Sequence, residues 1–128
     1  MVVLNRVMYV DDEEDLRSLV EMSLQMVGGM EVHLCSGGQE ALARLPVVRP
    51  DLVLLDVMMP NMDGLQTLEA IQALPDFAGL PVIFMTAKIR ETEIARLRGL
   101  GAADVIAKPF EVMQLPDQIR EIWSRLQV

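Results

Sequence analysis

Acidic, hydroxyl and ammonium side chains stand directly after short apolar runs at several points of the sequence. They are Asp11, Asp12, Asp56, Thr86 and Lys108. If the apolar runs are parallel strands, their carboxyl ends meet along the edge of the sheet where open α/β proteins bind ligands. Carboxylates so close together repel one another, and a hard cation such as Mg²⁺ that shares their oxygens stabilises them. One carboxylate can then attack a phosphoryl donor and form an acyl phosphate, while lysine and threonine donate hydrogen bonds to the transferring oxygens.

Each of these residues, taken singly, also has an ordinary structural explanation. An Asp after a strand often caps the next helix, a Thr often lies in a turn, and a Lys is usually solvated. Their joint position at the ends of neighbouring strands is what indicates a site for phosphate and metal. His33 is interpreted as an ordinary strand residue and Cys35 as a small core residue, so neither receives a chemical role.

Five apolar runs rich in Val, Leu and Ile are the expected strands. They occupy residues 7–10, 31–34, 52–55, 81–85 and 105–107. Segments with helical spacing of apolar residues separate and follow them, at 16–27, 39–45, 66–74, 92–98 and 115–126. Apolar strands that alternate with helices predict an α/β fold, a doubly wound five-stranded parallel sheet with helices on both faces. Gly28 and Gly29 are expected to end the first helix.

The composition is typical of one globular domain. The chain has 128 residues, of which 52% are hydrophobic, and its formal net charge is −8. The negative charge and the absence of a basic stripe argue against binding to nucleic acid or to an anionic membrane surface. The amino terminus turns acidic after a short apolar run, which predicts neither a signal peptide nor a spanning helix, so the cytoplasm is the expected compartment.

Four motifs give the sequence a specific resemblance to a known family. They are VDDE after the first expected strand, LLDVMMPNMDG through the third, FMTA at the end of the fourth, and GAADVIAKPF across the fifth. In this order and spacing, the chain resembles the receiver domain of two-component response regulators, the CheY-like family, over residues 1–128. The resemblance implies a flavodoxin-like (βα)5 fold with the strand order 2-1-3-4-5.

The resemblance also implies roles for the residues around the acidic cluster. Asp56 is similar to the phosphoacceptor of the family, and Asp12 and Asp56 are similar to its direct ligands for Mg²⁺ or Mn²⁺. The backbone carbonyl of Met58 would be the third protein ligand of the metal, and Asp11 would orient a metal-bound water. Gly64 fits as a turn residue that shapes the loop after Asp56.

Thr86 and Lys108 correspond to the switch residues of the family. Thr86 is similar to the hydroxyl that moves onto the phosphoryl group, and Lys108 to the lysine that pairs with it, beside a cis peptide bond before Pro109. Three residues before the lysine, where many relatives carry Tyr or Phe, this chain has Val105. We therefore expect the conformational readout to depend more on Thr86 and on the loop at 87–92.

Two positions that flank the hydrolytic water in the family hold Met58 and Lys88 in this chain. Met58 has no side-chain donor or acceptor that orients a water, so we expect slow self-dephosphorylation. Lys88 could reach the phosphoryl oxygens, although a solvated lysine is the ordinary interpretation.

A receiver domain implies metal-dependent transfer of a phosphoryl group to Asp56 from a histidine kinase or a histidine phosphotransfer protein. The phosphoryl group would bias a two-state equilibrium and change the surface of the fourth helix, fifth strand and fifth helix. Residues expected on that surface are Ile94, Leu97, Ile106 and part of 114–122. The surface would bind a downstream protein or output domain, or a second copy of the chain. Such a domain catalyses its own phosphorylation and dephosphorylation as a signalling switch rather than as a turnover enzyme.

The main alternative is a pseudo-receiver, which keeps the fold and binds partners without being phosphorylated. It predicts gaps in the acidic pocket, and none of the expected groups is missing. A haloacid-dehalogenase-type phosphatase needs a second Asp two residues after the nucleophile, where this chain has Met58. A flavodoxin-like FMN module needs a Ser-, Thr- and Gly-rich loop where this chain is acidic. The sequence leaves open the cognate kinase, the pathway, the oligomeric state and the presence of an output domain.

Overall fold

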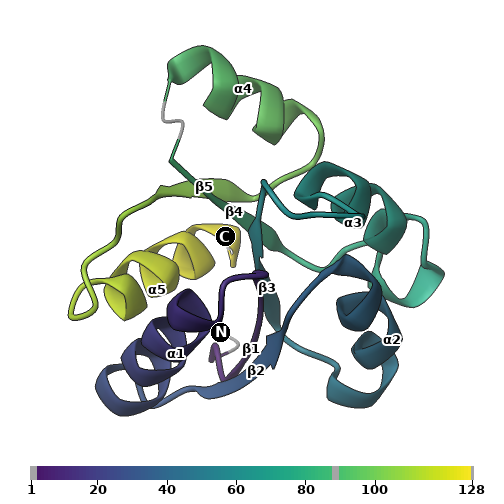
Figure 1. The fold of residues 1–128 in the computed structure, drawn as a ribbon. Coiled ribbons are helices and arrows are strands. Elements are labelled where there is room, and N and C mark those ends of the chain that lie inside the picture. Colours follow the sequence, from purple (N-terminus) through teal and green to yellow (C-terminus); the bar gives the residue numbers. More distant parts are fainter. Residues whose placement is uncertain (1–2, 88–89, 128) are drawn as a thin grey trace.

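Strands and helices alternate along the chain in the computed structural model, which describes residues 3–87 and 90–127 (Figure 1). The strands are β1 (Arg6–Val10), β2 (Glu31–Cys35), β3 (Leu52–Asp56), β4 (Val82–Thr86) and β5 (Asp104–Ala107). The helices are α1 (Glu14–Met22), α2 (Gly38–Val48), α3 (Gly64–Gln72), α4 (Glu91–Gly99) and α5 (Leu115–Leu126), with a π-helical turn η1 (Ser23–Val27) after α1 and a 3₁₀ turn η2 (Pro75–Phe77) after α3. Every predicted strand and helix is present, with ends that differ by a few residues.

The five strands form one parallel sheet in the order β2-β1-β3-β4-β5, which confirms the predicted fold. The order reverses at β1, which pairs with both β2 and β3. Val10 of β1 lies beside Leu55 of β3, and Leu55 lies beside Phe84 of β4. Because the strands are in register here, Asp11, Asp56 and Thr86 reach the same edge of the sheet, at the point where the strand order reverses.

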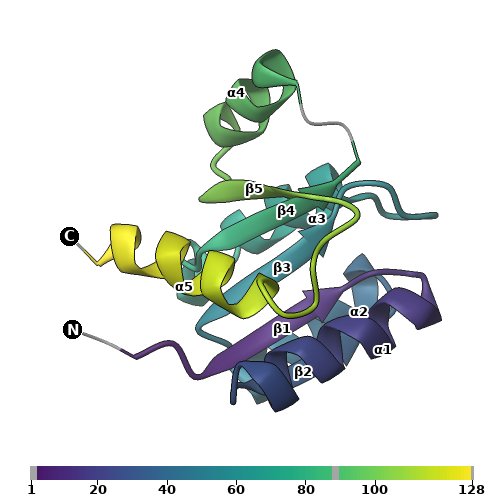
Figure 2. The ribbon, with the colours of Figure 1, turned by 90° about the vertical axis from the view of Figure 1, so that its left-hand side faces the viewer.

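Side chains alternate between the two faces of the sheet and form two core clusters. Val7, Tyr9 and Leu54 belong to the cluster that packs against α1 and α5. Met8 and Val10 belong to the cluster that packs against α2, α3 and α4. Figures 1 and 2 show the resulting layers, with α1 and α5 on one face and α2 and α3 on the other. None of the helices in the described part of the chain is long and apolar enough to cross a bilayer.

The first helix ends at the predicted glycines, but its buried face is narrower than predicted. α1 continues into η1, and the chain then leaves the helix at Gly29, whose φ is 68°. Leu19 and Val27, which helical spacing assigns to the buried face, are 41% and 40% exposed. Leu19 lies at the border of the apolar stripe. Val27 is turned away from the core because a π turn departs from the spacing of an α-helix.

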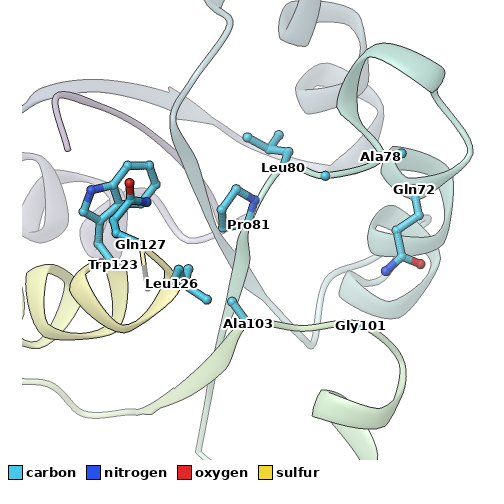
Figure 3. Close-up of a pocket in the computed structure, with 10 residues that line it drawn as sticks. Gln72, Ala78, Leu80, Pro81, Gly101, Ala103, Trp123, Leu126 and Gln127 are labelled. Atoms are coloured by element: carbon cyan, nitrogen blue, oxygen red, sulfur yellow. The ribbon is translucent and has the colours of Figure 1, made fainter. Parts of the chain in front are cut away.

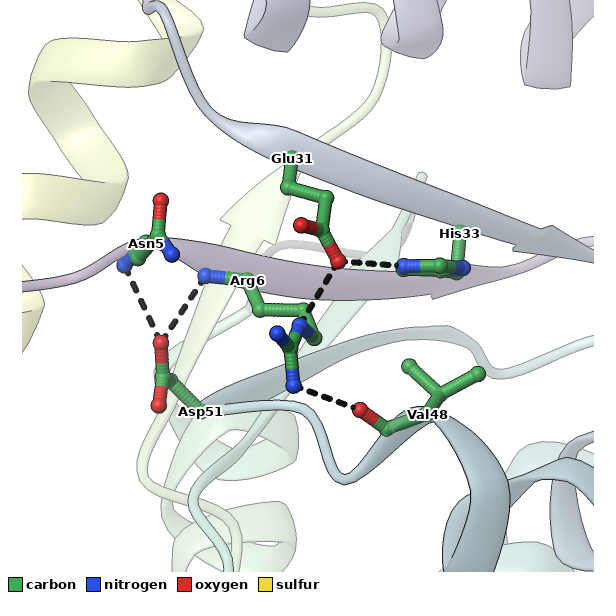
Figure 4. A network of polar contacts seen from close by, with 6 residues as sticks. All are labelled: Asn5, Arg6, Glu31, His33, Val48 and Asp51. Carbon is green, nitrogen blue, oxygen red and sulfur yellow. Dashed lines mark hydrogen bonds and ion pairs between the residues drawn. The ribbon is translucent and has the colours of Figure 1, made fainter.

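A polar network joins the amino ends of β1 and β2 to the end of α2 (Figure 4). Its members are Asn5, Arg6, Glu31, His33, Val48 and Asp51. Asp51 Oδ2 accepts hydrogen bonds from the backbone amides of Asn5 and Arg6, at 3.0 and 2.8 Å. The Arg6 guanidinium donates to Glu31 and to the Val48 carbonyl. The ring of His33 in β2 forms a hydrogen bond with the side chain of Glu31, the first residue of the same edge strand.

Candidate functional site

Three carboxylates converge at the carboxyl ends of β1 and β3. Asp11 and Asp56 are buried, Asp12 is exposed, and one oxygen of each lies within 4.8 Å of the others. Asp11 and Asp12 follow β1 directly, and Asp56 is the last residue of β3, so the parallel pairing of these strands creates the cluster. The structure therefore brings together the three acidic residues that the sequence predicted. Hard oxygen donors at this spacing are suited to a divalent cation such as Mg²⁺.

Lys108 connects two of these carboxylates. Its ammonium donates to Asp11 Oδ2 and to Asp56 Oδ1, both at 3.0 Å. Burial lowers the pKa of Lys108, but the hydrogen bonds to Asp56 and Asp11 outweigh burial and raise the pKa above its ordinary value. The ammonium is therefore charged at neutral pH. Burial raises the pKa of Asp56, and the charges of Asp11 and Asp12 add to this effect while the Lys108 hydrogen bond opposes it.

Tyr9 contacts this cluster and was not predicted as a site residue. Its hydroxyl donates to Asp11 Oδ2 at 2.5 Å, and the backbone amide of Glu13 donates to Asp11 Oδ1 at 3.0 Å. Burial and the bond to Asp11 raise the pKa of Tyr9, so the phenol is protonated. In the sequence, Tyr9 was interpreted only as part of an apolar strand. The two-residue period of a strand, which puts Tyr9 and Asp11 on one face, is the signal that could have identified it.

Thr86 and Lys108 end neighbouring segments at the same edge of the sheet. Thr86 is the last residue of β4 and is buried, and its carbonyl accepts a hydrogen bond of 2.9 Å from the Lys108 amide. The peptide bond between Lys108 and Pro109 is cis, as the resemblance implied. Both predicted switch residues thus lie beside the acidic cluster. Thr86 lies there because it ends β4, next to β3, and Lys108 because its ammonium bonds Asp11 and Asp56.

The loop after Asp56 is fitted closely to the end of β3. A Cβ atom at Gly64 would lie 2.4 Å from the Asp56 carbonyl oxygen, so only glycine fits there without a shift of the backbone. The Gly64 amide donates to the Val57 carbonyl and closes the loop. The side chain of Met58 in this loop is 72% exposed. Lys88, the other residue predicted to flank the hydrolytic water, lies outside the described residues.

The predicted readout surface is only partly at the surface. Leu97 and Ile106, which were expected there, are buried in the two core clusters, so this part of the prediction is wrong. α4 and β5 are short, so the sequence pattern alone does not show which side of each is buried. Val105 is half-buried and packs against the cluster under α4. A groove of about 270 Å³ between β5 and α5 remains, and it is lined in part by Gln118 and Glu121.

A further cavity, of about 520 Å³, lies at the opposite end of the sheet (Figure 3). Pro81 and Ala103, which precede β4 and β5, line it together with Trp123 near the end of α5. No titratable side chain is among its lining residues. This cavity therefore offers no acid, base or nucleophile comparable to those at the carboxyl ends of the strands.

The family model of the response regulator receiver domain matches residues 7–120 of the chain. The transcriptional regulatory protein TrcR of Mycobacterium tuberculosis is 38% identical over 122 residues, which are 94% of this chain and 46% of TrcR. The alkaline phosphatase synthesis transcriptional regulatory protein PhoP of Bacillus subtilis is 31% identical over 123 residues, which are 96% of this chain and 50% of PhoP. The chain thus spans about half the length of these curated relatives.

Solved structures show the same similarity. The chemotaxis response regulator CheY4 of Vibrio cholerae superposes with a TM-score of 0.86 at 28% identity, and the match covers 94% of this chain and 99% of CheY4. The signal receiver domain of a DNA-binding response regulator from Colwellia psychrerythraea gives a TM-score of 0.81 at 25% identity, over 94% of this chain and 98% of that domain. The fold, the acidic cluster and the family match over residues 7–120 all indicate the same family. The chain belongs to the response regulator receiver domain family.

Proposed function

We propose that this receiver domain is a phosphorylation switch in which Asp56 accepts a phosphoryl group from a histidine kinase or a histidine phosphotransfer protein. The observation that carries the proposal is the position of the Lys108 ammonium, which bonds Asp56 at 3.0 Å within a cluster of three carboxylates. A carboxylate with a charged donor beside it is prepared for attack on a phosphoryl group. The same ammonium also donates a hydrogen bond to Asp11 Oδ2, at 3.0 Å.

In the proposed reaction, a carboxylate oxygen of Asp56 attacks the phosphorus of a phosphohistidine. An O–P bond to Asp56 forms and the N–P bond of the donor breaks. The imidazole leaves with the electron pair and takes up a proton. Lys108 donates hydrogen bonds to the transferring oxygens, and the Thr86 hydroxyl, at the end of the neighbouring strand, then moves onto the phosphoryl group.

Asp12 and Asp56 would hold a divalent metal directly, with the Met58 carbonyl as a third protein ligand and Asp11 orienting a bound water. The three carboxylates have the hard oxygen donors that Mg²⁺ or Mn²⁺ takes in proteins, and their spacing fits one ion. Bound Mg²⁺ would neutralise part of the negative charge on the transferring oxygens. The exposure of Asp12 leaves this side of the cluster open to a donor.

The partners follow from the family. A donor protein with a phosphohistidine would meet the edge of the sheet that carries Asp56, in the cytoplasm. The relatives TrcR and PhoP are named as transcriptional regulators, and the chain spans about half of each. We therefore propose that a downstream protein or an output domain reads the surface of α4, β5 and α5. That surface could also pair two copies of the chain.

The decisive experiment is intact mass spectrometry after incubation with acetyl phosphate, with Mg²⁺ or with EDTA. The proposal predicts a single phosphoryl adduct that needs Mg²⁺ and is absent from an Asp56→Asn variant. An Asp76→Asn variant is the matched control, because Asp76 is an exposed carboxylate in η2, and it should form the adduct as wild type does. A folded wild-type protein without an adduct would instead support the phosphorylation-independent pseudo-receiver.

A further inference from the structure

Both oxygens of the Asp11 carboxylate are occupied by fixed donors. Oδ2 accepts hydrogen bonds from the Tyr9 hydroxyl at 2.5 Å and from the Lys108 ammonium at 3.0 Å. Oδ1 accepts a hydrogen bond from the Glu13 amide at 3.0 Å. Asp11 is fully buried, so each lost donor would leave a buried carboxylate oxygen with a weaker set of partners.

The hydroxyl of Tyr9 is held in place by its ring. The ring is fully buried in the cluster between the sheet and the helices α1 and α5, where Val20 and Ile119 are among its members. Tyr9 and Asp11 are two residues apart along the strand direction, so both side chains point to the same side of the sheet. A rigid, buried ring therefore presents one donor to one oxygen of Asp11.

Lys108 divides its ammonium between Asp11 and Asp56. If the Tyr9 hydroxyl were absent, Asp11 Oδ2 would keep the hydrogen bond from Lys108, and the less satisfied carboxylate would attract this ammonium more strongly, away from Asp56. The Asp11 carboxylate would also gain rotational freedom. The first change would weaken the hydrogen bond at Asp56, a proposed metal ligand, and the second would loosen the carboxylate that would orient a metal-bound water.

We propose that Tyr9 is a positioning residue of the phosphorylation site: its hydroxyl fixes the Asp11 carboxylate and leaves Lys108 available to Asp56. This inference rests on the proposed function and adds a residue to its site. Removing a group that orients metal ligands typically changes the affinity about 10–100-fold. Tyr9 would act indirectly, through Asp11, which would orient a metal-bound water, and through Lys108, which bonds the proposed ligand Asp56. We therefore expect an effect at the lower end of that range. The role differs from that of a core residue, because it acts on metal affinity and not only on stability.

The test compares Tyr9→Phe with wild type, using isothermal titration calorimetry with Mg²⁺ alone. The variant should bind Mg²⁺ roughly tenfold more weakly. Amide exchange without Mg²⁺ should show faster exchange at Glu13, whose amide bonds the same carboxylate. Ser23→Ala is the matched control, since it removes another buried hydroxyl, bonded to the Val112 carbonyl, and it should leave both measurements as in wild type.

A second measurement keeps the test independent of how the variant folds. Tyr9 is the only tyrosine of the chain, so 3-fluorotyrosine labels it alone, and its ¹⁹F resonance in the otherwise wild-type protein should shift as Mg²⁺ is added. Equal Mg²⁺ affinity and equal Glu13 exchange in wild type and Tyr9→Phe would overturn the inference, as would a ¹⁹F resonance that Mg²⁺ leaves unchanged while it binds. If wild type bound no Mg²⁺ and gained no phosphoryl group, the proposed function would fail, and Glu13 exchange would still decide the role of Tyr9.

Discussion

At the residue scale, the site depends on one ammonium placed between two buried carboxylates. Burial and the charges of Asp11 and Asp12 disfavour the ionised form of Asp56, while Lys108 favours it. In the proposed reaction a nucleophilic carboxylate must be ionised when it attacks, so Lys108 would act before transfer as well as during it. The side chain of Met58, in the loop after Asp56, has no polar group to offer to the same region.

Met58 leads to a prediction about the lifetime of the phosphoryl group. Replacing this exposed side chain with Asn should speed dephosphorylation about threefold or more, because an amide can orient the attacking water. The decay of the phosphoryl adduct by intact mass spectrometry measures the rate. Met113→Asn is the matched control, because Met113 is similarly exposed, at 70% against 72%, and lies in the loop after β5. Wild-type decay as fast as that of chemotaxis-type receivers would contradict the expected slow hydrolysis.

At the element scale, α4 buries few side chains against the sheet. Leu97 is its one fully buried side chain among the described residues. Asp104, at the start of β5, accepts hydrogen bonds from Arg98 of α4 at 2.6 Å and from Arg125 of α5 at 2.8 Å. These ion pairs join the three elements that would carry the readout. A helix with so little buried surface is suited to a change of position on phosphorylation.

The ion pairs of Asp104 predict a pH-dependent contribution to stability. Burial alone would raise the pKa of Asp104, but the hydrogen bonds from Arg98, the Val105 amide and Arg125 outweigh it and lower the pKa. The contribution is therefore complete above the unfolded-state pKa of about 3.9 and is lost as pH falls through the lower folded-state pKa. Asp104→Asn should lower the free energy of unfolding at pH 7 by about 1–2 kcal/mol, since both arginines are half exposed.

Urea unfolding of wild type and Asp104→Asn, at pH 7 and at steps below pH 4, tests this expectation. The difference in the free energy of unfolding should close at the lower pH values. Glu93→Gln serves as the control, because its pair with Arg96 lies at the surface of α4 and should contribute less than about 0.5 kcal/mol. A difference between wild type and Asp104→Asn that is absent at pH 7, or that persists at low pH, would contradict the assignment.

The fold and the acidic cluster could be predicted because both depend on local pattern. Apolar runs between helical segments identify a parallel sheet, and its strand ends must meet, so Asp11 and Asp56 were expected together. Tyr9 was missed because its ring satisfies the apolar pattern and its hydroxyl matters only through a neighbour. Leu97 and Ile106 were misplaced because no local pattern specifies that α4 packs against one face of the sheet and α5 against the other, and this packing buries Leu97 in one core cluster and Ile106 in the other.

At the scale of the whole molecule, negative charge dominates, and part of it lies at the site. The chain carries a formal net charge of −8, and three carboxylates share one edge of the sheet. A cation that binds the folded state and not the unfolded chain stabilises the fold by mass action. The acidic edge of the sheet would therefore couple folding to a bound divalent cation.

Mg²⁺ should raise the midpoint of thermal unfolding, and EDTA should reverse the change. At a concentration ten times the dissociation constant, the gain in free energy of unfolding is about 1.4 kcal/mol. Calorimetry of wild type and Asp12→Asn provides the comparison, with Ca²⁺-free buffer at constant ionic strength. The Asp12→Asn variant should show little response. An equal response in both proteins would mean that the cation acts elsewhere on the acidic surface.

The most direct test of phosphorylation at Asp56 is to locate the modified residue. The protein is incubated with acetyl phosphate and Mg²⁺, the acyl phosphate is trapped by borohydride reduction, and the peptides are sequenced by mass spectrometry. We expect one modified residue, Asp56, and none in Asp56→Asn. Modification at Asp11 or Asp12, or no modification of a folded protein that binds Mg²⁺, would contradict it.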